Sequence, residues 1–428
     1  MIDIIRGLLG LAVIIGIAWL LSGNRKAINW RLVAGGIILQ LVLAVLMLKV
    51  PFFKIILGGI SAGFVQVLNF SAEGAEFIFG RLTTEARSFG TVFAFRVVPS
   101  IIFFSALTSV LYYFGILQKI VYGFAWVMYR SMRLTGAESL AAAANVFVGQ
   151  TEAPLIVKPY IEKMTRSEIL ALMTGGMATI AGAVMVAFIS FLGGGDTARQ
   201  TEFGKHLLTA SLLSAPAALL LAKILLPETE EVTRDLEVKQ EEVGVNAFDA
   251  ASSGTTQGIT LALNVAAILI VFIAFIAMGN AILGWVGGWT GLNTTIARGF
   301  DGRFEGLSLE FLFAVLFAPI AWIIGVDWAS CLQVGQLLGE KLVLNEFVAY
   351  VHLGEMIGSD ALTDERAIII ATYALCGFAN FSSMGIQIGG IGAIAPSRRG
   401  TLSQLAFKSL IAGTFACLMT ACIAGMFL

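Results

Sequence analysis

The feature that most constrains this chain is a set of long apolar runs that carry few or no charges. The run from residue 258 to 283 reads GITLALNVAAILIVFIAFIAMGNAIL and contains no Asp, Glu, Lys or Arg. A helix needs about 20 apolar residues to cross a hydrocarbon core about 30 Å thick. Comparable runs recur along the chain, and only 13% of its residues are charged, against about 25% in a typical soluble domain. The sequence therefore predicts an all-α, polytopic helical membrane protein.

Eight segments are the strongest candidates for transmembrane helices. They are residues 5–22, 31–49, 94–114, 167–193, 205–226, 258–283, 366–392 and 403–427. Basic residues favour the cytoplasmic ends of spans, and here they follow the first and third spans and precede the last. We therefore expect both termini on the outer face of the membrane. The basic residues used are Arg25, Lys26, Arg31, Lys119, Arg130, Arg133, Arg398 and Arg399.

Three further segments do not fit simple spans. Residues 52–80 and 116–132 mix glycine, aromatic and charged residues, and we expect them to lie along the membrane surface as amphipathic helices. Residues 227–254 carry eight acidic and two basic side chains, which predicts a solvated acidic linker between two halves of the chain.

Composition excludes several classes of function. The formal net charge of −1 gives no electrostatic footprint for nucleic acid. The four cysteines lie scattered in apolar segments without metal-ligand spacing, so we expect small buried packing residues. With only two histidines, the chain also lacks the usual ligands of a histidine-based metal or haem site, and it offers no nucleophile–base pair for an intramembrane hydrolase.

Two long stretches, 137–164 and 329–362, are apolar at both ends but interrupted by polar residues in the middle. The interruptions are GQTEAP at 149–154 and LNEFVAY at 344–350. The eleven residues from Ala137 to Phe147 make a helix of about 16 Å, half of a bilayer core. Gly149 and Pro154 bracket the first patch and would break a helix there. We expect two re-entrant hairpins, with an ordinary span containing a polar patch as the alternative.

Each expected hairpin is followed by a span that contains a similar small-residue motif. GMATIAG (176–182) follows the first and GFANFSS (377–383) the second, and each span is followed by another apolar span. This order predicts an inverted repeat with discontinuous helices, an arrangement typical of secondary transporters whose site lies between the repeats. The motifs align without gaps, and Gly176, Ala178 and Thr179 match Gly377, Ala379 and Asn380.

The tips of the two hairpins each carry a carboxylate, Glu152 in the first and Glu346 in the second. A carboxylate at the bilayer centre costs about 2.5–3.5 kcal/mol on insertion scales, so it should face a water-filled cavity or a partner. The neighbouring polar residues are neutral, and we expect Arg96 to anchor a span edge at the interface. The sequence therefore favours a neutral solute rich in hydroxyl or amide groups. An alternative is that Lys158 and Lys341 neutralise the two carboxylates.

At these residues the chain resembles the concentrative nucleoside transporter family, in its shorter bacterial form. The motifs are GQTEAPLIVKPY (149–160), LNEFVAY (344–350), CGFANFSSMGI (376–386) and IIFFSALTSVLYYFGILQ (101–118). The resemblance implies a homotrimer in the bacterial cytoplasmic (inner) membrane that imports nucleosides such as uridine with sodium. It also implies an elevator mechanism, in which a transport domain moves against a scaffold domain.

The resemblance divides the chain and assigns roles. Residues 1–134 and 258–328 would form the scaffold, 135–227 and 329–428 the two transport-domain repeats, and 228–257 the acidic cytoplasmic linker. The nucleobase would contact Gln150, Thr151, Glu152 and Val184. The ribose would contact Glu346, Asn380 and Ser383, with Phe378 nearby. Sodium would be bound by Asn145, Thr179 and the carbonyl oxygens of Val148 and Ile180.

Several alternatives stay open at this stage. Proton coupling is one, because the sequence favours sodium only through the Asn145 and Thr179 oxygens. A sodium-coupled carrier of another neutral solute, such as a nucleobase or amino acid, is a second, and a channel is a third. No cofactor other than a coupling ion is expected, and purine or pyrimidine preference is not fixed.

Overall fold

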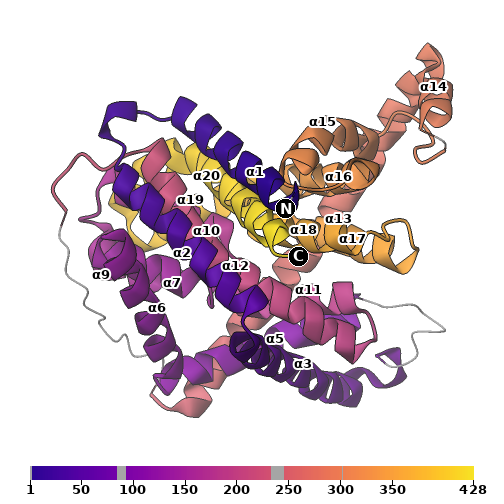
Figure 1. Cartoon of the computed structure of the whole chain (residues 1–428). Coiled ribbons are helices and arrows are strands. Elements are labelled where there is room, and N and C mark those ends of the chain that lie inside the picture. The colour runs from indigo at the N-terminus through magenta and orange to yellow at the C-terminus, as the bar shows by residue number, and fades with distance from the viewer. Residues whose placement is uncertain (1, 84–92, 233–244, 301) are drawn as a thin grey trace.

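The computed structural model describes residues 2–83, 93–232, 245–300 and 302–428, and within them the chain is helical and has no β-strand. Figure 1 shows the helices packed around the central helices α10, α12 and α20, with α14 at one extremity. This confirms the all-α prediction. The helices are α1 (Ile2–Leu20), α2 (Trp30–Lys49), α3 (Pro51–Phe79), α5 (Phe93–Tyr113), α6 (Ile116–Met132), α7 (Gly136–Asn145), α8 (Ala153–Ile156), α9 (Lys158–Ile161), α10 (Arg166–Ala178), α11 (Gly182–Gly193), α12 (Thr197–Leu225), α13 (Ala247–Thr290), α14 (Leu292–Gly299), α15 (Leu309–Ile323), α16 (Cys331–Val343), α17 (Glu346–Gly358), α18 (Glu365–Leu375), α19 (Phe381–Ile394) and α20 (Arg399–Met426).

The described residues contain seven helices or helix pairs long and apolar enough to cross a membrane, and up to eight with the bent pair α5–α6. This agrees with the expected number of about eight. Two of the expected spans are broken: residues 167–193 divide into α10 and α11, and residues 366–392 divide into α18 and α19. Polytopic helical architecture is therefore confirmed, with the breaks at the small polar motifs.

Some boundaries differ from the expectation. Helix α3 is a single 29-residue helix that is long and apolar enough to cross a membrane, and its placement along the membrane surface stays a prediction. Helix α13 begins at Ala247, inside the expected linker, because Asn246 caps its first turn by accepting a hydrogen bond from the Asp249 amide at 2.9 Å. The middle of the acidic segment (233–244) and the Arg96 side chain lie outside the described residues.

Helices α5 and α13 pack closely along each other. A Cβ atom on Gly258 would lie 2.7 Å from the Ile102 Cα atom, and one on Gly254 would lie 2.8 Å from the Ala106 Cα atom. Glycines four residues apart let two membrane helices approach backbone to backbone, where van der Waals packing and not the hydrophobic effect drives association. The pair is therefore held by a surface that tolerates no side chain at either glycine.

Helix α1 packs against α20 in the opposite direction, and α2 packs on α12. A Cβ atom on Gly7 would lie 2.4 Å from the Met426 side chain, so the start of α1 lies beside the end of α20. Figure 1 accordingly shows the two termini next to each other. Although α1 and α2 belong to the segment expected to be scaffold, they pack on elements of the two repeats.

The entrances of α7 and α10 are held by a shared polar cluster. Each helix begins with a capping box, Thr135 with Glu138 and Thr165 with Glu168, which satisfies amides that the first turn leaves unpaired. The buried Lys223 ammonium, from the last turn of α12, forms an ion pair with Glu138 and donates to the Ser167 hydroxyl at 2.9 Å. This cluster fixes where the two helices start relative to each other.

All four cysteines are buried and free, as the sequence predicted for small packing residues.

Candidate functional site

The first interrupted stretch folds as a helix, a seven-residue break and two short helical turns. Helix α7 has 10 residues, about 15 Å long, so it cannot cross a membrane alone. The break carries the polar motif, and the Gly149 amide donates to the Glu152 carboxylate within it. The chain therefore turns back at the motif, as a hairpin requires.

The second interrupted stretch has the same form with a tighter turn. Helices α16 and α17 have 13 residues each and are separated by Leu344 and Asn345 alone. The Asn345 side chain accepts a hydrogen bond from the Val348 amide at 3.0 Å and so starts α17. This places Glu346 at the first position of the returning helix, at the turn.

The tips of both hairpins and both broken helices line one cavity of about 750 Å³. This volume lies within the about 300–1,000 Å³ usual for small-molecule sites. All eight residues assigned to the substrate from the sequence line this cavity: Gln150, Thr151, Glu152, Val184, Glu346, Phe378, Asn380 and Ser383. The structure thus brings together two groups of residues almost 200 positions apart in the chain.

A hydrogen-bonded carboxylate lies on one side of the cavity. Asn380 donates from Nδ2 to the Glu346 carboxylate at 2.7 Å, and Glu346 is only 2% exposed. The Asn380 Oδ1 atom accepts from the Ser383 amide at 2.8 Å and the Ser382 hydroxyl at 2.7 Å, which fixes the orientation of the amide. One Glu346 oxygen therefore accepts from Asn380, and the carboxylate lines the cavity that a hydroxyl-bearing solute would enter.

Gln150 connects the two repeats across the cavity. Its Nε2 atom donates to the Ser383 hydroxyl at 3.3 Å, between the tip of the first hairpin and the start of α19. Thr151 is exposed to the cavity, and Val184 is buried in its wall. Amide, hydroxyl and carboxylate groups thus surround an otherwise apolar space, and this arrangement can read the edge of a neutral solute through hydrogen bonds.

The lysines do not neutralise these carboxylates. Within the described residues, the Lys341 ammonium is buried and donates to the Ala374 carbonyl oxygen at 2.8 Å, and Lys158 is exposed. No ion pair of Glu152 or Glu346 is formed in the described part of the chain.

All four residues assigned to sodium are buried and lie at the breaks, Asn145 and Val148 where α7 ends and Thr179 and Ile180 between α10 and α11. Asn145 donates from Nδ2 to the Ala141 carbonyl oxygen at 3.0 Å, and its Oδ1 atom is buried without a hydrogen-bond partner. The Thr179 hydroxyl donates its hydrogen to the Gly175 carbonyl oxygen at 2.8 Å, so the lone pairs of the hydroxyl oxygen point away from Gly175. Asn145 packs on Gly175, since a Cβ atom there would lie 3.2 Å from Nδ2. Asn145 packs on the same glycine to which the Thr179 hydroxyl donates, and an unpartnered amide oxygen and a hydroxyl are ligands that suit a hard cation such as sodium.

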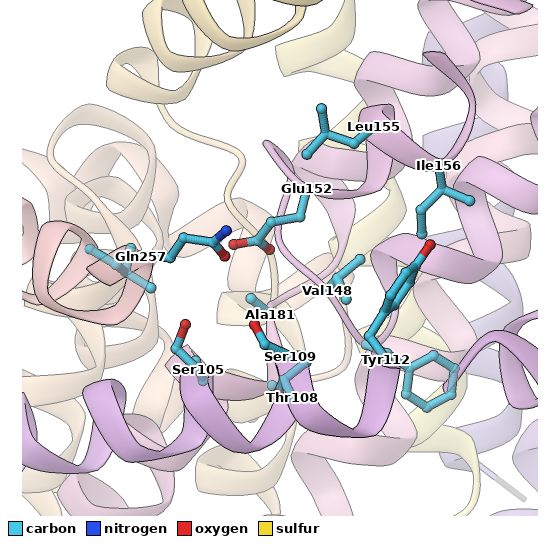
Figure 2. Close-up of a pocket in the computed structure, with 14 residues that line it drawn as sticks. Ser105, Thr108, Ser109, Tyr112, Val148, Glu152, Leu155, Ile156, Ala181 and Gln257 are labelled. Carbon is cyan, nitrogen blue, oxygen red and sulfur yellow. The ribbon is translucent and has the colours of Figure 1, made fainter. Parts of the chain in front are cut away.

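Sequence reasoning missed the side of the cavity formed by α13. Thr256, Gln257, Thr260 and Asn264 line it from this helix. Figure 2 shows the adjoining smaller pocket, in which the Gln257 amide and the Glu152 carboxylate point toward each other. The signal was present in the sequence, because polar residues at positions i, i+3 or i+4 and i+7 or i+8 of an apolar span mark a face turned away from lipid.

Family profiles cover most of the chain. The profile of the C-terminal part of Na+-dependent nucleoside transporters matches residues 206–425, and the profile of the N-terminal part matches residues 9–82. A third profile, a gate domain described as nucleoside recognition, matches residues 94–195. The chain belongs to the sodium-dependent nucleoside transporter family. The resemblance noted from the motifs is confirmed, and so is the expectation that the chain is a transporter and not an enzyme.

Relatives of this family member occur in bacteria and mammals. An uncharacterized transporter of Haemophilus influenzae is 43% identical, over 100% of this chain and 98% of that protein. Solute carrier family 28 member 3 of Rattus norvegicus is 41% identical over 97% of this chain, which spans 58% of that longer protein. Sodium/nucleoside cotransporter 1 of Rattus norvegicus is 38% identical over 97% of this chain and 63% of its own length.

Solved structures of the transporter CNTnw share the fold. CNTnw in an inward-facing substrate-bound state has a TM-score of 0.90 and 41% identity, and the match covers 99% of this chain and 98% of that one. A CNTnw variant in an outward-facing state also has a TM-score of 0.90, with 40% identity, 100% coverage of this chain and 98% of that one.

Proposed function

We propose that this transporter imports nucleosides together with sodium, and that the residues around the central cavity bind the nucleoside. One observation carries the proposal: a single cavity is lined by Gln150, Thr151 and Glu152 on one side and by Glu346 and the Asn380 amide on the other. A nucleoside is uncharged, with amide-like edges at the base and a vicinal diol at the ribose. The arrangement of groups matches these two ends.

The ribose end is the better defined. A carboxylate accepts hydroxyl protons in hydrogen bonds roughly twice as strong as those between neutral groups. The Glu346 carboxylate lines the cavity and would accept the diol hydroxyls beside its bond from Asn380, and Ser383 also lines the cavity with a hydroxyl. Gln150 and Thr151 then face the base from the first hairpin, with Val184 and Phe378 providing apolar contact.

Sodium coupling follows from the buried residues assigned to sodium at the breaks. A cation bound by Asn145, Thr179 and the Val148 and Ile180 carbonyl oxygens would hold the end of α7 against the break between α10 and α11. Gly149 and Glu152 follow within a few residues, so binding of the ion shapes the tip that meets the base. Thermodynamic reciprocity then requires that the solute also increases the affinity for sodium.

An elevator mechanism agrees with the packing. Helices α5 and α13 form one closely packed pair, and the cavity lies between this pair and the hairpin tips. We infer that this pair belongs to the stationary scaffold, while the two repeats carry the solute, together with α1 and α2, which pack on α20 and α12. Solved structures of the similar CNTnw include inward-facing and outward-facing states.

Orientation and assembly complete the proposal. With both termini in the periplasm, the end of α5 and the start of α13 face the cytoplasm, so the pocket in Figure 2 lies on the cytoplasmic side of Glu152. We assign this conformation to the inward-facing state. The chain would work as a homotrimer in the bacterial inner membrane, with its exposed apolar faces against lipid or neighbouring subunits.

The test is uptake of radiolabelled uridine by the purified protein in liposomes, with and without an inward sodium gradient. We expect saturable, sodium-dependent accumulation that unlabelled nucleosides inhibit. Equal uptake in potassium buffer at a fixed pH gradient would indicate proton coupling instead. Inhibition by nucleobases or amino acids, but not by nucleosides, would refute the assignment of the substrate. Equilibration without accumulation would indicate a channel.

A further inference from the structure

Gln387 of α19 is a buried residue to which neither the motifs nor the assigned site gives a role. It is 1% exposed and lies behind Gln150, on the side away from the cavity. Its Nε2 atom donates to the Met173 carbonyl oxygen at 2.9 Å and to the Gln150 Oε1 atom at 3.1 Å. Gln387 therefore joins α10, α19 and the tip of the first hairpin.

The Met173 contact determines which way both amides point. A backbone carbonyl oxygen can only accept, so Gln387 must turn its NH₂ group, and not its oxygen, toward Met173. The second hydrogen of that NH₂ group then reaches the Gln150 side chain, which must present its own oxygen there. As a result the Gln150 NH₂ group is left facing Ser383 and the cavity.

The contact between the two amides depends on Gly176. A Cβ atom at this position would lie 2.7 Å from the Gln387 Nε2 atom and 2.9 Å from the Gln150 Cβ atom. Any side chain would push one of the two amides out of place. The glycine in α10 thus makes room for a hydrogen bond that spans 237 positions in sequence.

We propose that Gln387 is a positioning residue that fixes the Gln150 amide, so that the site presents N–H groups to the nucleobase. The inference rests on the proposed function, in which Gln150 contacts the base. It adds a preference, because an N–H donor pairs with a carbonyl oxygen and is mismatched with an exocyclic amine. Uracil carries a carbonyl oxygen at position 4, where cytosine carries an amine. The oriented amide therefore favours uridine over cytidine.

Gln387→Met tests the inference, because methionine keeps the length of the side chain and removes both N–H groups. The measurement is the ratio of the cytidine to the uridine Kd, from competition binding to the purified transporter at saturating sodium. In the variant the Gln150 amide is free to rotate, and we expect the ratio to fall about threefold to tenfold, the size of one neutral hydrogen bond.

The chain provides a matched control in Gln40. This glutamine is also fully buried, and its Nε2 atom also donates to a carbonyl oxygen, that of Leu213, at 2.9 Å, but it lies between α2 and α12. Gln40→Met should lower thermal stability and leave the ratio of the two Kd values unchanged. In a Gln150→Met background, Gln387→Met should cause no further change in the ratio, since its effect acts through Gln150.

The outcomes separate the two proposals. If the wild-type protein binds uridine but Gln387→Met keeps the wild-type ratio, the positioning role is refuted and the proposed function stands. If the wild-type protein binds no nucleoside, the proposed function fails, and this inference fails with it. Should Gln387→Met not fold, Gln387→Glu replaces it, because it keeps the shape but has at most one hydrogen to donate and cannot satisfy both acceptors.

Discussion

Replacing Glu346 by glutamine tests the ribose end of the site with a change of one functional group. In the wild type, Asn380 donates to one carboxylate oxygen at 2.7 Å, and its own oxygen is fixed by the Ser383 amide. Asn380 cannot rotate without losing those bonds. A glutamine at position 346 must therefore turn its oxygen to Asn380, and its NH₂ group would then face the ribose diol, where the wild type offers an acceptor.

The expected loss of uridine affinity in Glu346→Gln follows from the hydrogen bonds that change. Bonds to a charged group contribute about 1.5–3 kcal/mol and neutral ones about 0.5–1.5 kcal/mol. The loss is about 1–1.5 kcal/mol for each hydroxyl that donates to Glu346, or about fivefold to twelvefold in affinity. With two ribose hydroxyls within reach the two losses multiply, and we expect the uridine Kd to rise about 25-fold to 150-fold.

The assay is equilibrium binding at saturating sodium with two ligands, uridine and 2′,3′-dideoxyuridine. The second ligand lacks both hydroxyls, so Glu346→Gln should change its Kd less than about threefold, within the scatter expected for a distant polar change. Equal losses for the two ligands would refute ribose recognition by Glu346. A thermal unfolding curve of each protein shows whether the variant is folded.

Three further predictions address the ion site and the start of the linker. Asn145→Leu should abolish the sodium dependence of uridine binding, because it removes the orphaned buried oxygen; unchanged dependence in a titration with sodium would contradict the assignment. Thr179→Ser should keep sodium affinity and Thr179→Val should lower it about tenfold, since only serine retains the hydroxyl. Burial raises the pKa of Glu228, but the Lys223 ammonium and the Thr165 hydroxyl lower it more, so the folded-state pKa lies below the usual 4.5. Glu228 therefore stabilises the fold at neutral pH, and Glu228→Gln should lower the midpoint of thermal unfolding at pH 7. This difference should shrink as the pH falls below 4.5, because the wild-type carboxylate is then protonated as well. A difference in midpoint that does not depend on pH would contradict this.

Much of the fold was predictable because the hydrocarbon core of a membrane restricts which sequences can span it. A chain in hydrocarbon must satisfy its backbone within helices, so uncharged runs such as 258–283 identify spans directly. Breaks were predictable for the same reason: small polar motifs such as GMATIAG interrupt apolar runs only where the freed backbone has another partner.

The missed features depend on contacts between distant segments. The spacing of polar residues in α13 indicates a face turned away from lipid, but only the structure shows that this face lines the cavity with Gln257 opposite Glu152. Gln387 has no sequence motif, and its relation to Met173 exists only because α10 and α19 pack together.

The cluster around Lys223 has a mechanical consequence. Helix α7 ends at Asn145 and α10 ends just before Thr179. The first turns of both helices are bound to the same Lys223 ammonium, through Glu138 and Ser167. In the proposed elevator mechanism, this shared anchor would keep the distance between the far ends of α7 and α10 constant while the two repeats move. The proposed sodium site, which lies between those ends, would then keep its geometry during transport.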